Sequence, residues 1–194
     1  MPTVDERLFK LYDWIDFYCN TTDPVPGNMP EARGLSVSIS MFVDASHGGN
    51  MKDRRSQTGV LIFISKAPIN WYSKKQPSVE TSTFGTELCE INVGVDMVEA
   101  LRYKLRMFGV PFDGADNVFC DNEAVYKNTV MPESTLRKKH NSIDYHKCRE
   151  AAAAKKIRVV NQGTLKNLDD LFTNVLTIDH RRFLLDRFTY WWAG

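Results

Sequence analysis

The sequence predicts an α/β fold built on one mixed β-sheet, and two patterns of hydrophobic residues support that prediction. First, three segments with strand-like patterns follow one another between residues 36 and 73, joined by short polar loops. Second, helical and strand-like periodicities alternate along the rest of the chain. Consecutive strands with short loops form an antiparallel meander, whereas a helix between two strands permits parallel pairing. The expected order is β-β-β-α-β-α-(α)-β-α, a five-stranded sheet flanked by helices.

The meander begins with an alternating segment at 36–44, in which every second residue is apolar. That period is typical of a strand with one face on a core, and Asp44 falls on the opposite, more polar face. The run at 60–64 is apolar throughout, as in a strand buried on both faces. A third strand is expected at 69–73.

A long helix is expected next, with Ser82 or Thr83 as its cap, Gly109 at its end and Pro111 as a stop. Glu87 lies in its first turn, beside the apolar stripe that should face the core. An inward-facing carboxylate needs a partner. The stripe consists of Leu88, Ile91, Val95, Val98, Leu105 and Phe108.

The second half of the chain places two acidic residues at element ends. Asp121 follows a short apolar run at 118–120, and the carboxyl ends of strands are where α/β sheets keep their sites. Asp170 opens a final helix expected at about 169–176. The other expected elements are a helix at 123–127, an amphipathic segment at 145–156 and a strand at 157–160.

Composition bounds the class of protein. The 194 residues, 43% of them hydrophobic, can bury the core of one domain, and the net charge of +1 gives no general basicity. The four cysteines show no CxxC spacing and fall in helix- or strand-like stretches, which favours reduced, mostly buried thiols and an intracellular protein. No signal sequence and no membrane-length apolar run is found, so we expect no membrane partner. We divide the chain into a helical lead-in and linker (1–35), a domain (36–176) and an aromatic, basic tail (177–194).

Asp44, Glu87, Asp121 and Asp170 form the candidate site. Two divalent cations about 4 Å apart need several hard oxygen ligands, brought from different parts of a fold, to assist in-line displacement at phosphorus. Asp44, from the first strand, is the expected bridging ligand. Mg²⁺ is the expected metal, with Mn²⁺ as a substitute. Taken singly, each residue also has a simpler interpretation, as a turn residue or a helix cap.

A series of short strings resembles the ribonuclease H domain of copia-type retrotransposon polyproteins, in order and spacing. Among them are Cys120-Asp121-Asn122 and Asp169-Asp170-Leu171-Phe172-Thr173. The resemblance covers roughly residues 36 to 176. The strings lie at 42–46, 53–59, 69–76, 82–87, 120–122, 139–140, 145–146 and 169–173.

This resemblance implies a ribonuclease H-like fold that cuts the RNA strand of RNA–DNA hybrids during reverse transcription, with the four carboxylates as ligands of two Mg²⁺ ions. It also implies a reverse transcriptase portion of the same polyprotein as partner, and a cytoplasmic retrotransposon particle as location. The sequence departs from the family pattern at three places. Gly85-Thr86-Glu87-Leu88 replaces Glu-Ala-Glu-Tyr, Ser142 replaces an acidic residue, and Thr173-Asn174-Val175 replaces Thr-Lys-Pro.

Basic clusters and short polar side chains are expected to form a substrate-binding rim around the carboxylates. A solvated charged surface is the alternative for any one cluster. Trp71 is expected in the core rather than as a stacking platform. The predicted substrate contacts are Arg54, Arg55, Ser56, Ser73, Lys74, Lys75, Gln76, Ser82, Asn122, Lys139 and His140.

Two other functions remain open from the sequence. A transposase or another nuclease of the same architecture would keep its carboxylates at similar places. A non-catalytic nucleic-acid-binding or tethering module would keep the fold and lose only the geometry of the site.

Overall fold

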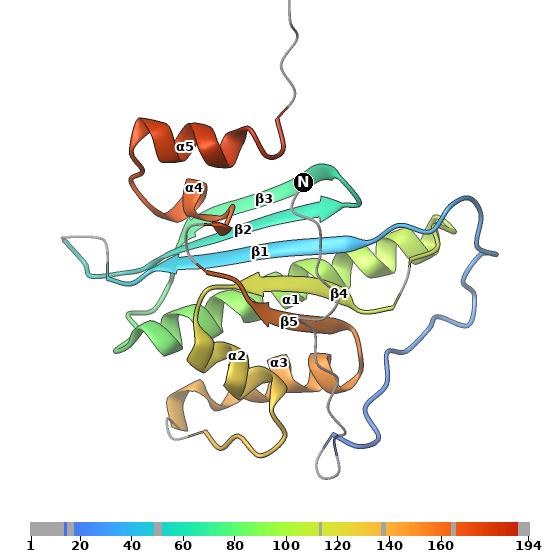
Figure 1. Cartoon of the computed structure of the whole chain (residues 1–194). Helices are drawn as coiled ribbons and strands as arrows, with labels where there is room; N and C mark the ends of the chain where they lie inside the picture. Colours follow the sequence, from blue (N-terminus) through green and yellow to red (C-terminus); the bar gives the residue numbers. More distant parts are fainter. Residues whose placement is uncertain are drawn as a thin grey trace, which may run out of the picture.

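The computed structural model describes residues 14, 18–48, 52–112, 114–136, 139–163 and 166–189. Apart from Trp14 and Tyr18, the helix expected in the lead-in lies outside these residues. The described chain forms one five-stranded sheet with strand order β3-β2-β1-β4-β5, flanked by helices on both faces (Figure 1). The strands are β1 (Ile39–Ser46), β2 (Gln57–Ile64), β3 (Ala67–Lys75), β4 (Asp116–Cys120) and β5 (Ile157–Asn161).

The strand pairing confirms the predicted mixed sheet. β1 and β2 are antiparallel, with Asp44 opposite Gly59, and β2 and β3 are antiparallel, with Gly59 opposite Ser73. β4 pairs in parallel with both β1 and β5. The β1–β4 register ends at Phe42 opposite Phe119, so β1 continues past β4 to reach Asp44.

The predicted long helix is α1 (Thr83–Met107). Ser82 caps it by accepting a hydrogen bond from the Gly85 N–H at 3.2 Å, as the sequence predicts. Gly109, at φ +69°, ends it in the left-handed conformation that glycine adopts readily. One residue of the predicted stripe is wrong: Phe108 lies just beyond the helix and is 80% exposed, whereas the other five are buried.

The remaining helices are α2 (Glu123–Val130), α3 (Ser142–Ala153), α4 (Asp170–Thr173) and α5 (Ile178–Leu185), with a short 3₁₀ turn η2 (Lys139–Asn141) before α3. The helix expected at 169–176 is wrong in extent, because the chain leaves α4 at Asn174 in an extended conformation and begins α5 after it. Part of the predicted tail is therefore packed: Leu184 of α5 is fully buried, and Phe188 contacts Phe63 edge-on.

Two hydrophobic cores lie on opposite faces of the sheet. α1, α2 and α3 cover one face, where Met41, Val43 and Ile91 are among the buried residues. α4 and α5 lie over the other face, above β1 and β2 in Figure 1, and cover Phe42, Leu61 and Phe63. The face of β1 expected to be more polar is thus a second core, and Asp44 is only 6% exposed. The sequence pattern alone did not reveal the helices that bury it.

An ionic cluster holds the lead-in to the domain at the start of β4. Arg102 donates to Asp23 at 2.8 Å and pairs with the buried Asp116 at 2.9 Å, and Arg106 also bonds Asp23. This cluster lies at the amino end of β4, whereas Asp121 follows its carboxyl end. The linker around Asp23 is therefore anchored away from the candidate site.

The expectations for the cysteines are confirmed in part, and the one for Trp71 is wrong. All four cysteines are free thiols, but only Cys120 and Cys148 are buried, and Cys19 is exposed. Trp71 is 65% exposed, so its expected core position is wrong: β3 is the edge strand, and its residues remain largely open to solvent. Within the described residues, no helix is both long and apolar enough to cross a membrane.

Candidate active site

Asp44 stands at the centre of the candidate site, near the end of β1. Its Oδ2 atom accepts hydrogen bonds from the Thr173 hydroxyl and, at 3.0 Å, from Asn174 Nδ2. The charge of the Asp170 carboxyl acts directly on the Asp44 carboxyl and raises its pKa. Asp44 and Asp170 are therefore direct neighbours, although 126 residues separate them in the chain.

Asp170 comes from the first position of α4, where it is 2% exposed. Asn174 Nδ2 donates to Asp170 Oδ1 at 3.2 Å as well as to Asp44, so one amide links the two carboxyls. Thr173 and Asn174 fall where the family pattern has Thr-Lys. The sequence did not mark either as a site residue, although Thr173 lies in one of the family-like strings and Asn174 departs from the family pattern.

Glu87 approaches from the first turns of α1 and is partly buried. Its Oε1 atom accepts a hydrogen bond from Asn122 Nδ2 at 3.1 Å. Asn122 caps α2 at the same time, because its Oδ1 accepts from the N–H groups of Ala124 and Val125. The predicted substrate contact Asn122 is thus a fixed link between Glu87 and the β4–α2 turn that carries Asp121.

The four carboxylates influence one another electrostatically. The pKa of Asp44 is raised to about 7, mainly by burial and in addition by the charges of Asp170 and Asp121. Burial also raises the pKa of Glu87 to about 7, with contributions from Asp121 and Asp44. The pKa of Asp170 is raised mainly by burial, and by Asp121. Without a counter-charge, the site therefore retains protons near neutral pH.

The structure brings all four predicted carboxylates into one electrostatic cluster of hard oxygen donors, which is the chemistry that Mg²⁺ prefers. As they stand, however, no three His, Cys, Asp or Glu side chains of the described chain are arranged to hold a metal ion. The protons that Asp44 and Glu87 retain near neutral pH occupy oxygen atoms that a cation would need as ligands. The donor set fits a divalent cation, whereas the metal assignment itself stays a prediction.

The predicted basic rim is partly in place. Ser73 lies two strands from Asp44 in the register and donates to the Phe172 carbonyl at 2.8 Å, beside the site. Lys74 and Lys75 follow it and are exposed, with Lys75 paired to Asp53 at 3.0 Å. Arg54 and Arg55 are exposed before β2. Their contact with phosphates stays a prediction.

Two predicted substrate contacts lie inside the domain, and this corrects the expectation. Ser56 is 1% exposed, and its Oγ accepts from the Gly48 N–H at 3.1 Å. Gln76 is 3% exposed, and its Nε2 donates to Thr58 Oγ1 at 2.9 Å and to the Thr86 carbonyl at 3.0 Å. Their polar groups tie β2, β3 and α1 together instead of facing a ligand.

The Lys139–His140 segment lies near the amino end of α1. Lys139 and His140 are exposed, and His140 Nε2 is 3.6 Å from Glu80 Oε2. Asn141 Nδ2 donates to the same Glu80 oxygen at 3.3 Å. η2 is thus joined to the turn that precedes Ser82, on the side of the domain where α1 presents its first turn.

The sequence reasoning missed a second carboxyl pair behind Asp44. Glu90 Oε1 and Asp169 Oδ2 both accept from the Asp44 N–H, at 2.8 and 3.0 Å. Both residues are fully buried. A signal existed for each: Glu90 lies three residues after Glu87, on the same side of a helix, and Asp169 adjoins Asp170.

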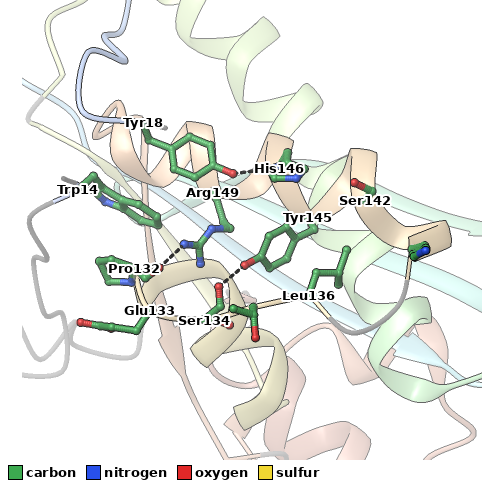
Figure 2. A pocket seen from close by; sticks show the side chains of 12 residues that line it. Trp14, Tyr18, Pro132, Glu133, Ser134, Leu136, Ser142, Tyr145, His146 and Arg149 are labelled. Atoms are coloured by element: carbon green, nitrogen blue, oxygen red, sulfur yellow. Dashed lines mark hydrogen bonds between the residues drawn. The ribbon is translucent and has the colours of Figure 1, made fainter. Parts of the chain in front are cut away.

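A cavity of about 690 Å³ lies away from these carboxylates, between α3 and the segment that follows α2. Figure 2 shows Arg149 at its centre, beside the rings of Trp14, Tyr18 and Tyr145. The Arg149 guanidinium also donates to three backbone carbonyls at 2.8–2.9 Å. Its donors are engaged by the protein, so we assign Arg149 a structural role.

Comparison with solved structures defines the class of fold. The structure matches LC11-RNase H1, isolated from compost by a metagenomic approach, with a TM-score of 0.55 at 16% identity, over 70% of this chain and 92% of that one. It matches the N-terminal RNase H domain of a Mycobacterium tuberculosis protein with a TM-score of 0.52 at 13% identity, over 78% and 98% of the two chains. The predicted ribonuclease H-like fold is confirmed.

Comparison with curated proteins then shows similarity to retrotransposon sequences. It is 28% identical over 145 residues to the retrovirus-related Pol polyprotein from transposon RE1 of Arabidopsis thaliana, and 29% identical over 144 residues to that from transposon TNT 1-94 of Nicotiana tabacum. These alignments cover 75% and 74% of this chain. The chain spans about a tenth of each polyprotein. No family model matches the chain. The expected resemblance to the ribonuclease H region of a retrotransposon polyprotein is thus confirmed.

Proposed function

We propose that this domain is a metal-dependent endoribonuclease that hydrolyses the RNA strand of RNA–DNA hybrids during reverse transcription of a retrotransposon. The observation that carries the proposal is the mutual electrostatic cluster of Asp44, Glu87, Asp121 and Asp170, which come from β1, α1, the β4–α2 turn and α4 of a ribonuclease H-like fold. A solved LC11-RNase H1 that matches this fold is in complex with RNA/DNA hybrid, which supports the choice of substrate.

Asp44, Glu87, Asp121 and Asp170 would hold two Mg²⁺ ions, with Mn²⁺ as a substitute. Bound divalent cations supply activation of the attacking water and stabilisation of charge on the leaving 3′ oxygen. The protein's own part is to release the protons that Asp44 and Glu87 retain near pH 7. Thr173 and Asn174, which donate to Asp44 Oδ2, keep that carboxylate oriented.

The exposed cations flank this cluster as a phosphate-binding rim. Lys74, Arg54 and Arg55 are suited to the hybrid backbone, and the Ser73 hydroxyl is suited to sugar or phosphate contacts. Contacts to 2′-hydroxyl groups would distinguish RNA from DNA. The same proposal includes a reverse transcriptase portion as a partner in the polyprotein and an intracellular particle as the place of action.

A substrate panel tests the proposal. Hybrid, duplex DNA and single-stranded RNA of one sequence are incubated with the chain in Mg²⁺, in Mn²⁺ and in chelator. Cleavage confined to the RNA of the hybrid, and dependent on the metal, supports the ribonuclease. Cleavage of duplex DNA would support another nuclease of this fold, and hybrid binding without cleavage in either metal would support the tethering module.

A further inference from the structure

Side chains hold the peptide group between Val43 and Asp44 on both of its polar atoms. Asn167 Nδ2 donates to the Val43 carbonyl at 2.8 Å. The Asp44 N–H donates to Glu90 Oε1 at 2.8 Å and to Asp169 Oδ2 at 3.0 Å. Strand peptides ordinarily bond neighbouring strands. The last β1–β4 pair is Phe42 with Phe119. At the next peptide group, between Val43 and Asp44, side chains take the place of the neighbouring strand as hydrogen-bond partners.

We call these three side chains the Asp44 clasp (Glu90, Asn167 and Asp169). They also make hydrogen bonds within the set and to β2. All three are 0% exposed. Asn167 Oδ1 accepts from the Asp169 N–H at 3.3 Å, and Glu90 Oε1 accepts a second hydrogen bond, from the Gly59 N–H, at 2.9 Å. The clasp therefore connects α1, β1, β2 and the segment that leads into α4.

The fit of the clasp against β2 leaves no space for a side chain at residue 59. A Cβ atom on Gly59 would lie 2.5 Å from Asp169 Oδ2 and 2.6 Å from Thr173 Cγ2. Contacts that short require the neighbours to move. The close approach seats α4 on the backbone of β2, and so places Asp170 and Thr173 against the Asp44 carboxyl.

The clasp is chemically costly for a buried site. Glu90 Oε2 and Asp169 Oδ1 are buried without a hydrogen-bond partner among the described residues. Two buried carboxyls next to a cluster of four more oppose folding, and apolar residues of similar size would favour stability. Residues that break the rules of a stable core concentrate at functional sites.

We propose that Glu90, Asn167 and Asp169 are positioning residues, which fix the Val43–Asp44 peptide and thereby aim the Asp44 carboxylate at the reacting centre. The proposal deepens the proposed function and rests on it, since positioning matters only if Asp44 takes part in turnover. Glu90 and Asp169 act through the oxygens that accept from the Asp44 N–H, and Asn167 through the N–H that it donates to the Val43 carbonyl. A displacement of about 1 Å at a catalytic group can reduce the rate about 100-fold.

The test removes the two acceptors of the Asp44 N–H, singly and together. Glu90→Met and Asp169→Ala each leave one acceptor, and the double variant leaves none. We expect kcat on a hybrid to fall about tenfold in each single variant and about 100-fold in the double variant, with KM within about threefold. Amide exchange at Asp44 should accelerate in the same order, and Mn²⁺ affinity, titrated without substrate, should weaken.

Conservative and remote variants separate positioning from stability. Glu90→Gln and Asp169→Asn keep an oxygen acceptor and should recover most of the turnover lost in the Met and Ala variants. Asp116→Asn provides a matched control, because Asp116 is equally buried but lies at the other end of β4. This variant should lower the free energy of unfolding. It should leave the rate of Asp44 amide exchange, kcat and Mn²⁺ affinity unchanged. If the double variant does not fold, the two single variants carry the comparison.

The proposal would be overturned if the single variants fold and their kcat, Mn²⁺ affinity and Asp44 amide exchange all stay within twofold of wild type. Failure of the proposed function looks different, because wild type would then cleave no hybrid. In that case the Asp44 amide exchange and Mn²⁺ affinity still decide whether the clasp positions Asp44.

Discussion

Replacing Asp44 by Asn should stabilise the metal-free protein and abolish its cleavage activity. In the folded state Asp44 is buried and has a pKa of about 7, against an ordinary value of 3.8. The folded protein therefore holds a proton that the unfolded chain releases, and stability falls as pH rises from about 4 to about 7. An asparagine at this position has no proton to lose, so the variant escapes that decline.

The magnitude follows from the pKa. One pKa unit corresponds to about 1.4 kcal/mol, and the slope falls as the pH approaches the folded-state pKa, so the advantage of Asp44→Asn in free energy of unfolding should grow by about 2 kcal/mol between pH 5 and pH 7 and then level off. That corresponds to roughly 4–8 °C in Tm for a chain of this size.

Urea unfolding of both proteins at pH 5, 6, 7 and 8, with chelator present, measures this difference. Saturating Mg²⁺ should then cancel most of the difference at pH 8, because a cation at 100 times its Kd stabilises wild type by about 2.7 kcal/mol and the variant by much less. A difference in stability that is independent of pH would refute the assigned environment of Asp44. Equal stabilisation of both proteins by Mg²⁺ would refute its role as a ligand.

Three further changes test other parts of the structure. Gly59→Ala should destabilise by about 1–3 kcal/mol in urea unfolding and slow cleavage, because its Cβ would overlap Asp169 and Thr173; unchanged stability would contradict the close packing of α4 on β2. Lys74→Ala should weaken hybrid binding and reduce the slope of log affinity against log salt by about one, as for a lysine on a phosphate; an unchanged slope would remove Lys74 from the rim. Arg149→Lys should lower the free energy of unfolding by about 2–3 kcal/mol and leave kcat unaltered, because the planar guanidinium serves three carbonyls; a loss of kcat at full folding would assign the cavity in Figure 2 a role in turnover.

The sequence predicted the sheet and the elements that carry the four carboxylates because those features are local. Alternation marks β1, a continuous apolar run marks β2, and Ser82 with Gly109 brackets α1. The same locality explains the errors at the carboxyl end. α4 spans only Asp170–Thr173, which is too short to show a repeating helical pattern. In α5, Leu184 is the buried residue, so the sequence carries no apolar stripe that would mark this helix.

The part of the site that sequence reasoning missed depends on tertiary contacts. Glu90 reads as an ordinary helix residue until Asp44 and Gly59 are placed beside it, and Asn167 reads as part of a linker until it meets Val43. The prediction that Ser56 and Gln76 contact substrate was wrong, because polar residues near a site can serve either a ligand or a hydrogen-bond network inside the protein. Only packing shows that their partners lie inside the protein.

The chemical nature of the RNA ends tests the central claim most directly. A labelled RNA–DNA hybrid is cut by wild type in Mg²⁺, with Asp44→Asn as the matched control, and the product ends are analysed. In-line attack by water predicts 5′-phosphate and 3′-hydroxyl ends on the RNA strand, and no product from Asp44→Asn. Ends with 2′,3′-cyclic phosphate, or equal cutting by both proteins, would contradict a carboxylate-centred, metal-dependent hydrolysis in this domain.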